Sequence, residues 1–144
     1  NFRMTNFQAA LGLAQMNKIN NLLKKRKKIF EIYKDIFKEN LSLELLPIPK
    51  NTENSYWLYT LVINNIGQKR RDNLILNLQK LGIECRPGFY SLNKMRRFKR
   101  YAKGKFNNSN YLSENSISLP TTNLTKKDQE YIISMFLDEY KKIK

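Results

Sequence analysis

The alternation of hydrophobic and polar residues predicts a long helix at the start of the chain. Apolar side chains recur every three or four positions over residues 6–38, which is the spacing of one face of an α-helix. Thr5 and Gln8 have the spacing of a capping box, so we expect the helix to begin at about Asn6. Such a helix is longer than a small domain needs for its own core, and we expect it to reach into a second domain.

The pattern then changes to that of short strands. A brief alternation of apolar and polar residues at 41–46 is closed by Pro47. Residues 56–63 are aromatic and β-branched, which is typical of a strand buried on at least one face. Two further strands are expected at residues 83–86 and 117–119, and each of them is followed by a proline.

Two more helices are expected between and after these strands. Residues 72–81 carry leucines on one face and are followed by Gly82, which can end a helix. Thr125 and Asp128 repeat the capping spacing and predict a terminal helix. Helices that alternate with short strands predict an α+β fold, in which a small, mainly antiparallel sheet is covered by helices. No repeat or linker divides the sequence, so we expect residues 1–144 to form one domain.

The composition narrows the possible functions. The chain has 27 Lys and Arg against 12 Asp and Glu, a net charge of +15, and no histidine. Without histidine there is no catalytic triad, no histidine metal-ligand set and no ready acid or base at neutral pH. Cys85 is the only cysteine, which excludes an internal disulfide and fits a reducing compartment, so we expect a cytoplasmic protein. No apolar run approaches the roughly 18 residues of a spanning helix, and we expect no membrane partner.

Two basic segments make nucleic acid a candidate partner. Five consecutive cations occupy residues 24–28, and cations alternate with aromatic residues at 96–101. Such a combination can bind single-stranded nucleic acid, and it can equally frame a nucleotide diphosphate. Lysine is abundant throughout the chain, however, so we interpret the first segment as a solvated helix face and do not expect nucleic acid to be the partner.

Two polar segments are candidate binding sites. Arg86, Tyr90 and Asn93 follow a predicted strand, where loops commonly carry function, and an arginine fork suits a phosphate. The alternative is a surface loop with its aromatic side chains in the core. Asn1 and Arg3 precede a helix start, where amides, a guanidinium and the helix dipole can together bind an anion. The alternative there is a solvated loop.

Five motifs, in the same order, resemble those of one enzyme family. They are NFRMTNFQAALGLAQ at residues 1–15, SYWLY at 55–59, GIECRP at 82–87, FYSLNKM at 89–95, and SLP at 118–120 followed by LT. The series is similar to the C-terminal part of the DegT/DnrJ/EryC1/StrS family, the sugar aminotransferases that use pyridoxal 5'-phosphate (PLP). Within this family, the FYSLNKM motif most resembles the perosamine-synthase branch.

The resemblance implies a fold and a role. It implies the small C-terminal domain of a fold-type I aminotransferase, with residues 1–40 linking to a PLP-binding large domain outside this sequence. It also implies transfer of an amino group, usually from glutamate, to a nucleotide-linked keto sugar by a homodimer with an active site shared between subunits. Asn1 would then contact the PLP phosphate of the neighbouring subunit, with Arg3 close by. The residues implied to line the sugar-nucleotide pocket are Arg86, Tyr90 and Asn93.

The sequence departs from the family pattern in two places. The usual Pro-Leu-His is Ser91-Leu92-Asn93, and the histidine before Ser-Tyr-Trp is Asn54. In the family the Schiff-base lysine lies upstream of the first motif, so we expect no catalytic residue in this chain and no activity from the chain alone. Two other functions remain open at this point: a basic nucleic-acid-binding module and a non-catalytic dimerisation domain.

Overall fold

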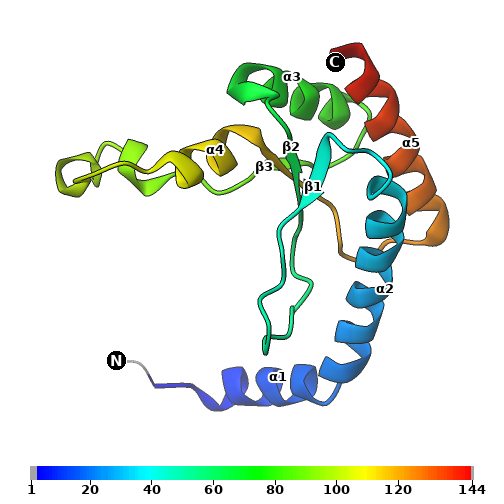
Figure 1. The fold of residues 1–144 in the computed structure, drawn as a ribbon. Coiled ribbons are helices and arrows are strands. Elements are labelled where there is room, and N and C mark those ends of the chain that lie inside the picture. Colours follow the sequence, from blue (N-terminus) through cyan, green and yellow to red (C-terminus); the bar gives the residue numbers. More distant parts are fainter. Residues whose placement is uncertain (1–2, 144) are drawn as a thin grey trace.

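The computed structural model describes residues 3–143 as a small sheet with helices around it (Figure 1). The helices are α1 (Asn6–Met16), α2 (Ile19–Phe37), α3 (Gly67–Lys80), α4 (Asn107–Asn115) and α5 (Lys126–Ile143), with short 3-10 helices η1 (Leu92–Lys94) and η2 (Lys99–Tyr101). The strands are β1 (Leu43–Leu45), β2 (Tyr59–Ile63), β3 (Arg86–Pro87) and β4 (Ser116–Leu119). Among the described residues, no helix is both long and apolar enough to cross a membrane.

The four strands form one antiparallel sheet in the order β1-β2-β4-β3, which confirms the predicted α+β class. In the central pair, Tyr59 lies opposite Leu119 and Thr60 lies opposite Ser118. Because side chains alternate between the two faces of a strand, Tyr59 and Leu119 share one face and the two hydroxyl residues share the other. The sheet therefore has an apolar face and a face with small polar side chains.

The apolar face packs against α2, α3 and α5 and forms the core. Tyr59 and Tyr33 have ring centroids 4.8 Å apart, and Phe37 of α2 meets Phe136 of α5 edge to face at 5.2 Å. All four side chains are buried. Aromatic pairs of this kind contribute about 0.5–1.5 kcal/mol each beyond the burial of their area. This cluster joins α2 and α5 to the sheet, and Leu74 and Leu78 bring α3 into the same core, so the three helices leave the polar face uncovered.

The predicted single helix over residues 6–38 is wrong, because the chain breaks between α1 and α2. Asn17 and Lys18 form a turn in which both backbone N–H groups donate to carbonyls of the last turn of α1. In Figure 1, α1 turns away from α2 and lies apart from the rest of the fold. None of its residues is buried, so within the described residues no packing holds it in line with α2.

The predicted strand boundaries were too wide. Tyr56 has a positive φ of 53°, and its backbone N–H donates to Asn54 Oδ1 at 2.7 Å. This local turn delays β2 until Tyr59 and leaves Trp57 outside the strand. The strand expected at residues 83–86 is reduced to Arg86 and Pro87.

Helix α4 was not predicted at all. Its sequence, NNSNYLSEN, is rich in Asn and Ser, which have low helix propensity because their side chains compete for backbone hydrogen bonds. Contacts from elsewhere in the chain support it. Arg71 of α3 is completely buried, and its Nη1 donates to the carbonyl oxygens of Ser113 and Ser116 at 3.0 and 2.9 Å. Tertiary contacts therefore outweigh the weak local preference.

The predicted helix ends agree better with the structure. Thr5 and Gln8 form the expected capping box, and so do Thr125 and Asp128 at the start of α5. Gly82 follows α3 with a φ of 78°, a conformation that side-chain-bearing residues rarely adopt. Helix α3 begins at Gly67 instead of residue 72, one turn earlier than the pattern predicted.

Candidate functional site

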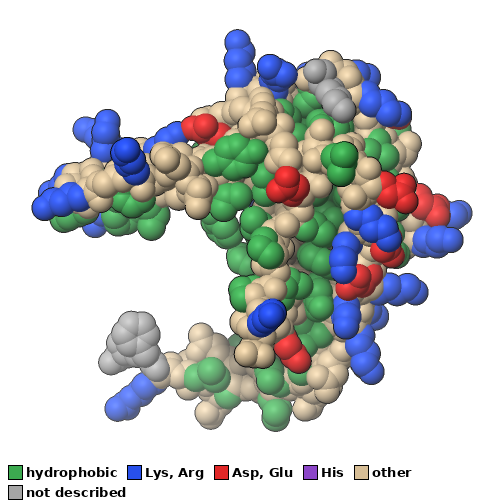
Figure 2. All heavy atoms as spheres, viewed as in Figure 1, with side chains coloured by type: hydrophobic (Ala, Val, Ile, Leu, Met, Phe, Trp, Pro, Cys, Tyr) green, Lys and Arg blue, Asp and Glu red, His purple; other side chains and the backbone are tan. Residues whose placement is uncertain are grey.

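The molecule is hollowed on one side, and hydrophobic side chains line much of this hollow (Figure 2). Within it, a pocket of about 630 Å³ lies over the polar face of the sheet. Its walls are the segment before β2, the loop at residues 89–93 and one side of α4. The pocket thus brings together segments as far apart in the sequence as Leu46 and Ser116.

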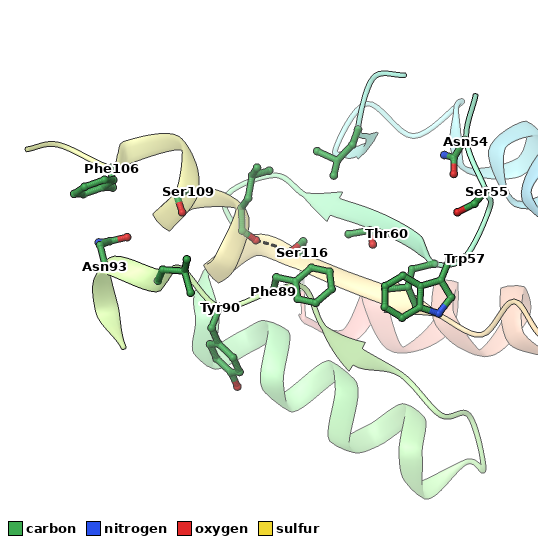
Figure 3. Close-up of a pocket in the computed structure, with 14 residues that line it drawn as sticks. Asn54, Ser55, Trp57, Thr60, Phe89, Tyr90, Asn93, Phe106, Ser109 and Ser116 are labelled. Carbon is green, nitrogen blue, oxygen red and sulfur yellow. Dashed lines mark hydrogen bonds between the residues drawn. The ribbon is translucent and has the colours of Figure 1, made fainter. Parts of the chain in front are cut away.

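The floor of the pocket is polar but uncharged. Thr60 of β2 and Ser116 of β4 both line it, and the Thr60 hydroxyl lies 3.0 Å from that of Ser118. The Ser116 hydroxyl donates to the Leu112 carbonyl at 2.6 Å, the bond drawn as a dashed line in Figure 3. These hydroxyl groups can donate or accept hydrogen bonds without introducing a charge.

Two exposed aromatic rings stand beside this floor. Trp57 and Phe89 lie close together in Figure 3, with ring centroids 6.5 Å apart and planes tilted by 45°. Trp57 is 61% exposed and Phe89 is 78% exposed, although side chains of this size are usually buried. Large exposed rings that line a pocket are typical of a ligand-binding site.

A network of hydrogen bonds positions the loop at residues 89–93. Its backbone N–H at Ser91 donates to the Ser113 hydroxyl at 3.2 Å, and the Ser91 hydroxyl lies 2.7 Å from that of Ser109. The Asn93 side chain accepts from Ser91 and donates from Nδ2 to Asn110 Oδ1 at 3.0 Å. Three of these partners belong to α4, so the unpredicted helix is what holds the loop.

The structure brings together two of the five site residues predicted from the sequence. Tyr90 and Asn93 both line the pocket, although Tyr90 also lines a smaller neighbouring hollow and its ring points away from Trp57 in Figure 3. Arg86 lies on β3 outside the pocket and pairs with Glu84. Arg3 is exposed just before α1, and Asn1 lies outside the described residues.

Most residues of the pocket were not predicted as site residues from the sequence. Trp57 was interpreted as part of a buried strand, whereas the turn at Tyr56 places it in the open. Thr60 and Ser116 carry no signal of their own, since small polar residues are common on any solvated sheet face. The available signals were Asn54, which replaces a family histidine, and the motif at residues 55–59, since Asn54, Ser55 and Trp57 all line the pocket.

No charged residue lines this pocket, and that limits the chemistry it can perform. All the lysines in the part of the chain that the structure describes are exposed, and the described residues hold no group of His, Cys, Asp or Glu that could bind a metal ion. Burial raises the pKa of the Cys85 thiol to about 12, so it is not a nucleophile at neutral pH. The lining residues therefore do not fit PLP, whose phosphate needs a cation or several donors and whose aldehyde needs a lysine.

The fold is that of a sugar aminotransferase domain. The structure matches Spr1654 from Streptococcus pneumoniae, described as a sugar aminotransferase in its PLP form, with a TM-score of 0.89 and 27% sequence identity. The match covers 99% of this chain and 37% of that one. The family follows from the sequence: residues 1–137 match the DegT/DnrJ/EryC1/StrS aminotransferase family, and the chain belongs to it. This match confirms the family that the sequence motifs predicted.

Individual relatives agree with this assignment. The chain is 33% identical to the GDP-perosamine synthase of Vibrio cholerae over 122 residues, which are 84% of this chain and 33% of that protein. It is 28% identical over 123 residues to the GDP-4-keto-6-deoxy-D-mannose 3-dehydratase of Escherichia coli O55:H7, covering 81% of this chain and 31% of that enzyme. The chain thus spans about a third of the length of the relatives it matches.

Proposed function

We propose that the complete protein is a PLP-dependent aminotransferase that acts on a nucleotide-linked keto sugar, and that this chain binds the sugar. The observation that carries the proposal is the uncharged pocket, in which aromatic rings stand over a floor of hydroxyl groups. Family membership over residues 1–137 supports the reaction type. PLP supplies the amino-transfer chemistry when bound, and because the pocket does not fit it, we assign PLP to other parts of the protein.

The pocket residues have complementary roles in this proposal. The ring of Trp57 offers a flat apolar surface for the C–H side of a sugar ring, and Phe89 closes one edge. The hydroxyls of Thr60 and Ser116 face the same space and can bond sugar hydroxyls. The Asn93 side chain accepts one hydrogen bond through Oδ1 and donates one through Nδ2. Its second amide hydrogen can therefore donate to the substrate.

We also propose a homodimer with a shared active site. Helix α1 exposes several large apolar residues and none of its side chains is buried, which indicates a surface that another part of the assembly covers. Leu11 and Leu13 are both more than half exposed. Replacing both with serine in the complete protein should shift the mass measured by analytical ultracentrifugation from dimer to monomer. An unchanged dimer would exclude this surface from the contact.

The activity is tested by incubating the complete protein with PLP, glutamate and GDP-4-keto-6-deoxy-D-mannose. Mass spectrometry should show a nucleotide sugar in which an amino group replaces the keto oxygen. A product that has instead lost a hydroxyl would assign the dehydratase reaction and overturn the proposal. The 144-residue chain by itself should give no product, since the proposal places PLP elsewhere, and turnover by the chain alone would contradict that assignment.

The role of the pocket is tested with matched variants. Trp57→Ala should raise KM for the nucleotide sugar about tenfold and change kcat little, because stacking acts in substrate binding. Leu76→Ala is the control, since Leu76 is exposed on α3 outside the pocket. Equal effects of the two substitutions would show that the pocket does not bind the sugar. We propose a cytoplasmic location for the reaction, which the single reduced thiol of Cys85 supports.

A further inference from the structure

One segment of the chain has an extreme charge that the pocket does not explain. Residues 94–105, which we call the basic arm, contain seven Lys or Arg and no Asp or Glu. The arm runs through η2 and projects from the sheet beside α4 (Figure 1), and cations gather at its outer end (Figure 2). Both of its ends adjoin the pocket, because Asn93 and Phe106 line it.

Three arginines of the basic arm face a common space. Arg96, Arg97 and Arg100 together line a hollow of about 450 Å³. Tight turns bring them together: the N–H groups of Phe98 and Lys99 both donate to the Met95 carbonyl, each at 2.9 Å. None of the three arginines has an ion pair in the part of the chain that the structure describes, whereas Lys94 at the base of the arm pairs with Glu114.

The arginine hollow differs from an ordinary solvated basic face. In the run at residues 24–28, the lysines are exposed around the helix and Arg26 turns inward to donate to the Trp57 carbonyl at 3.3 Å. In the arm, by contrast, three arginines line one hollow, and the Cζ atom of Arg100 lies 4.7 Å from the centroid of the Tyr101 ring. Like charges that lie close together repel one another. A multivalent anion bound between them attracts each arginine, and this attraction can outweigh the repulsion.

The pocket and the arginine hollow complement each other. No charged residue lines the pocket, yet a nucleotide-linked sugar carries a diphosphate bonded directly to the sugar ring. Arg96 is three residues from Asn93, so their Cα atoms are at most roughly 10 Å apart. Guanidinium forks match phosphate oxygens in a bidentate way, which a lysine cannot do. The arginine hollow therefore begins next to the pocket, within reach of a diphosphate attached to a sugar there.

We propose that Arg96, Arg97 and Arg100 bind the diphosphate of the nucleotide-linked substrate while the pocket holds its sugar. This inference rests on the proposed function for the identity of the sugar, but the arginine hollow can be tested on its own. It also explains why the segment is basic in a chain whose pocket is neutral. The basic arm then positions the nucleotide part of the substrate, while the reacting keto carbon lies in the sugar, which the pocket holds.

The test measures GDP binding to the complete protein by calorimetry. A variant with Arg96→Gln, Arg97→Gln and Arg100→Gln should bind GDP about tenfold more weakly, since exposed ion pairs are individually modest and three are lost. The control carries Lys24→Gln, Lys25→Gln and Lys27→Gln, which remove the same charge from an exposed part of α2. The control should bind GDP as the unmodified protein does. Guanosine, which has no phosphate, should bind both variants equally.

Several outcomes would overturn the inference. Equal loss in both variants would show a general effect of net charge, and unchanged GDP affinity in the arginine variant would exclude the hollow. Loss of binding to a single-stranded oligonucleotide with GDP binding retained would assign the arm to nucleic acid instead. Arginine-dependent GDP binding in a protein without aminotransferase activity would keep the site and reject the proposed function. Aminotransferase activity with an unchanged KM in the arginine variant would keep the proposed function and reject the arginine hollow as the diphosphate site.

Discussion

The Nη1 atom of Arg71 lies 2.9 Å from the carbonyl oxygen of Ser116, and this bond joins α3 to the start of β4, directly after α4, in the interior of the protein. Arg71 is 0% exposed, and its Nε also pairs with Asp72 at 2.7 Å. A buried cation is stable only when such partners surround it. Because Ser116 lines the pocket and α4 holds the loop at residues 89–93, this one guanidinium supports the site from behind.

Replacing Arg71 with methionine should destabilise the protein strongly. The carbonyls that lose their donor stay buried, so we expect the free energy of unfolding to fall by about 3 kcal/mol in urea titrations. Arg70→Met is the matched control, since Arg70 is exposed on the same helix and should change stability by less than about 0.5 kcal/mol. Similar small effects of both substitutions would mean that the buried bonds contribute little.

Gly88 should not tolerate a side chain. A Cβ atom at this position would lie 1.9 Å from Ser116 Oγ and 3.0 Å from Ser116 Cβ. Gly88→Ala should therefore lower the free energy of unfolding by about 1–3 kcal/mol. Gly12→Ala is a useful contrast, because nothing lies within 4 Å of its added Cβ, and alanine should stabilise α1 by up to about 1 kcal/mol.

The clash at Gly88 can be isolated with a double mutant. Adding Ser116→Gly removes the atoms that the new methyl group would meet, so the double mutant should be more stable than the sum of the two single effects predicts. Chemical denaturation of all four proteins measures this coupling. Simple additivity would show that the close approach between Gly88 and Ser116 is not the cause.

The cap of α5 should make stability depend on acid pH. Hydrogen bonds from the Thr125 hydroxyl and N–H, each 2.7 Å long, lower the pKa of Asp128 below its usual 3.8. The charged carboxylate therefore stabilises the folded state above that pH, and this contribution is lost as the pH falls through the lowered pKa. Asp128→Asn should be less stable than the unmodified protein at neutral pH, and the difference should shrink below about pH 4.

The partner of Asp128 provides the control for this effect. In a Thr125→Val background the donor hydroxyl is gone, so Asp128→Asn should show a much smaller dependence on pH. Thermal unfolding of the four proteins between neutral and acid pH makes the comparison. An equal pH dependence in both backgrounds would place its origin outside the cap.

Cys85 should be inert in the folded protein. Its side chain is 0% exposed, and burial raises the pKa of the thiol to about 12, so almost no thiolate forms at pH 8. Iodoacetamide should label it far more slowly in buffer than in denaturing urea, as followed by the mass of the intact chain. Equally fast labelling in both conditions would show that the core around Cys85 opens readily.

Much of the local structure could be read from the sequence because it depends on neighbours in the chain. The capping pairs Thr5 with Gln8 and Thr125 with Asp128 act over three residues, and the helix stop at Gly82 depends on the conformation of one residue. The family resemblance was likewise a property of ordered motifs, and residues 1–137 confirm it.

The pocket and α4 could not be predicted because they depend on contacts between distant residues. Helix α4 has weak intrinsic propensity and is supported by Arg71, more than 40 residues away in the sequence. The exposure of Trp57 follows from a turn at Tyr56 that no periodicity reveals. The sequence by itself determined the fold class, the caps and the family, since those follow from local spacing. Only tertiary structure decided which side chains meet in the pocket, because bringing together residues that are distant in the sequence requires the whole chain to be folded.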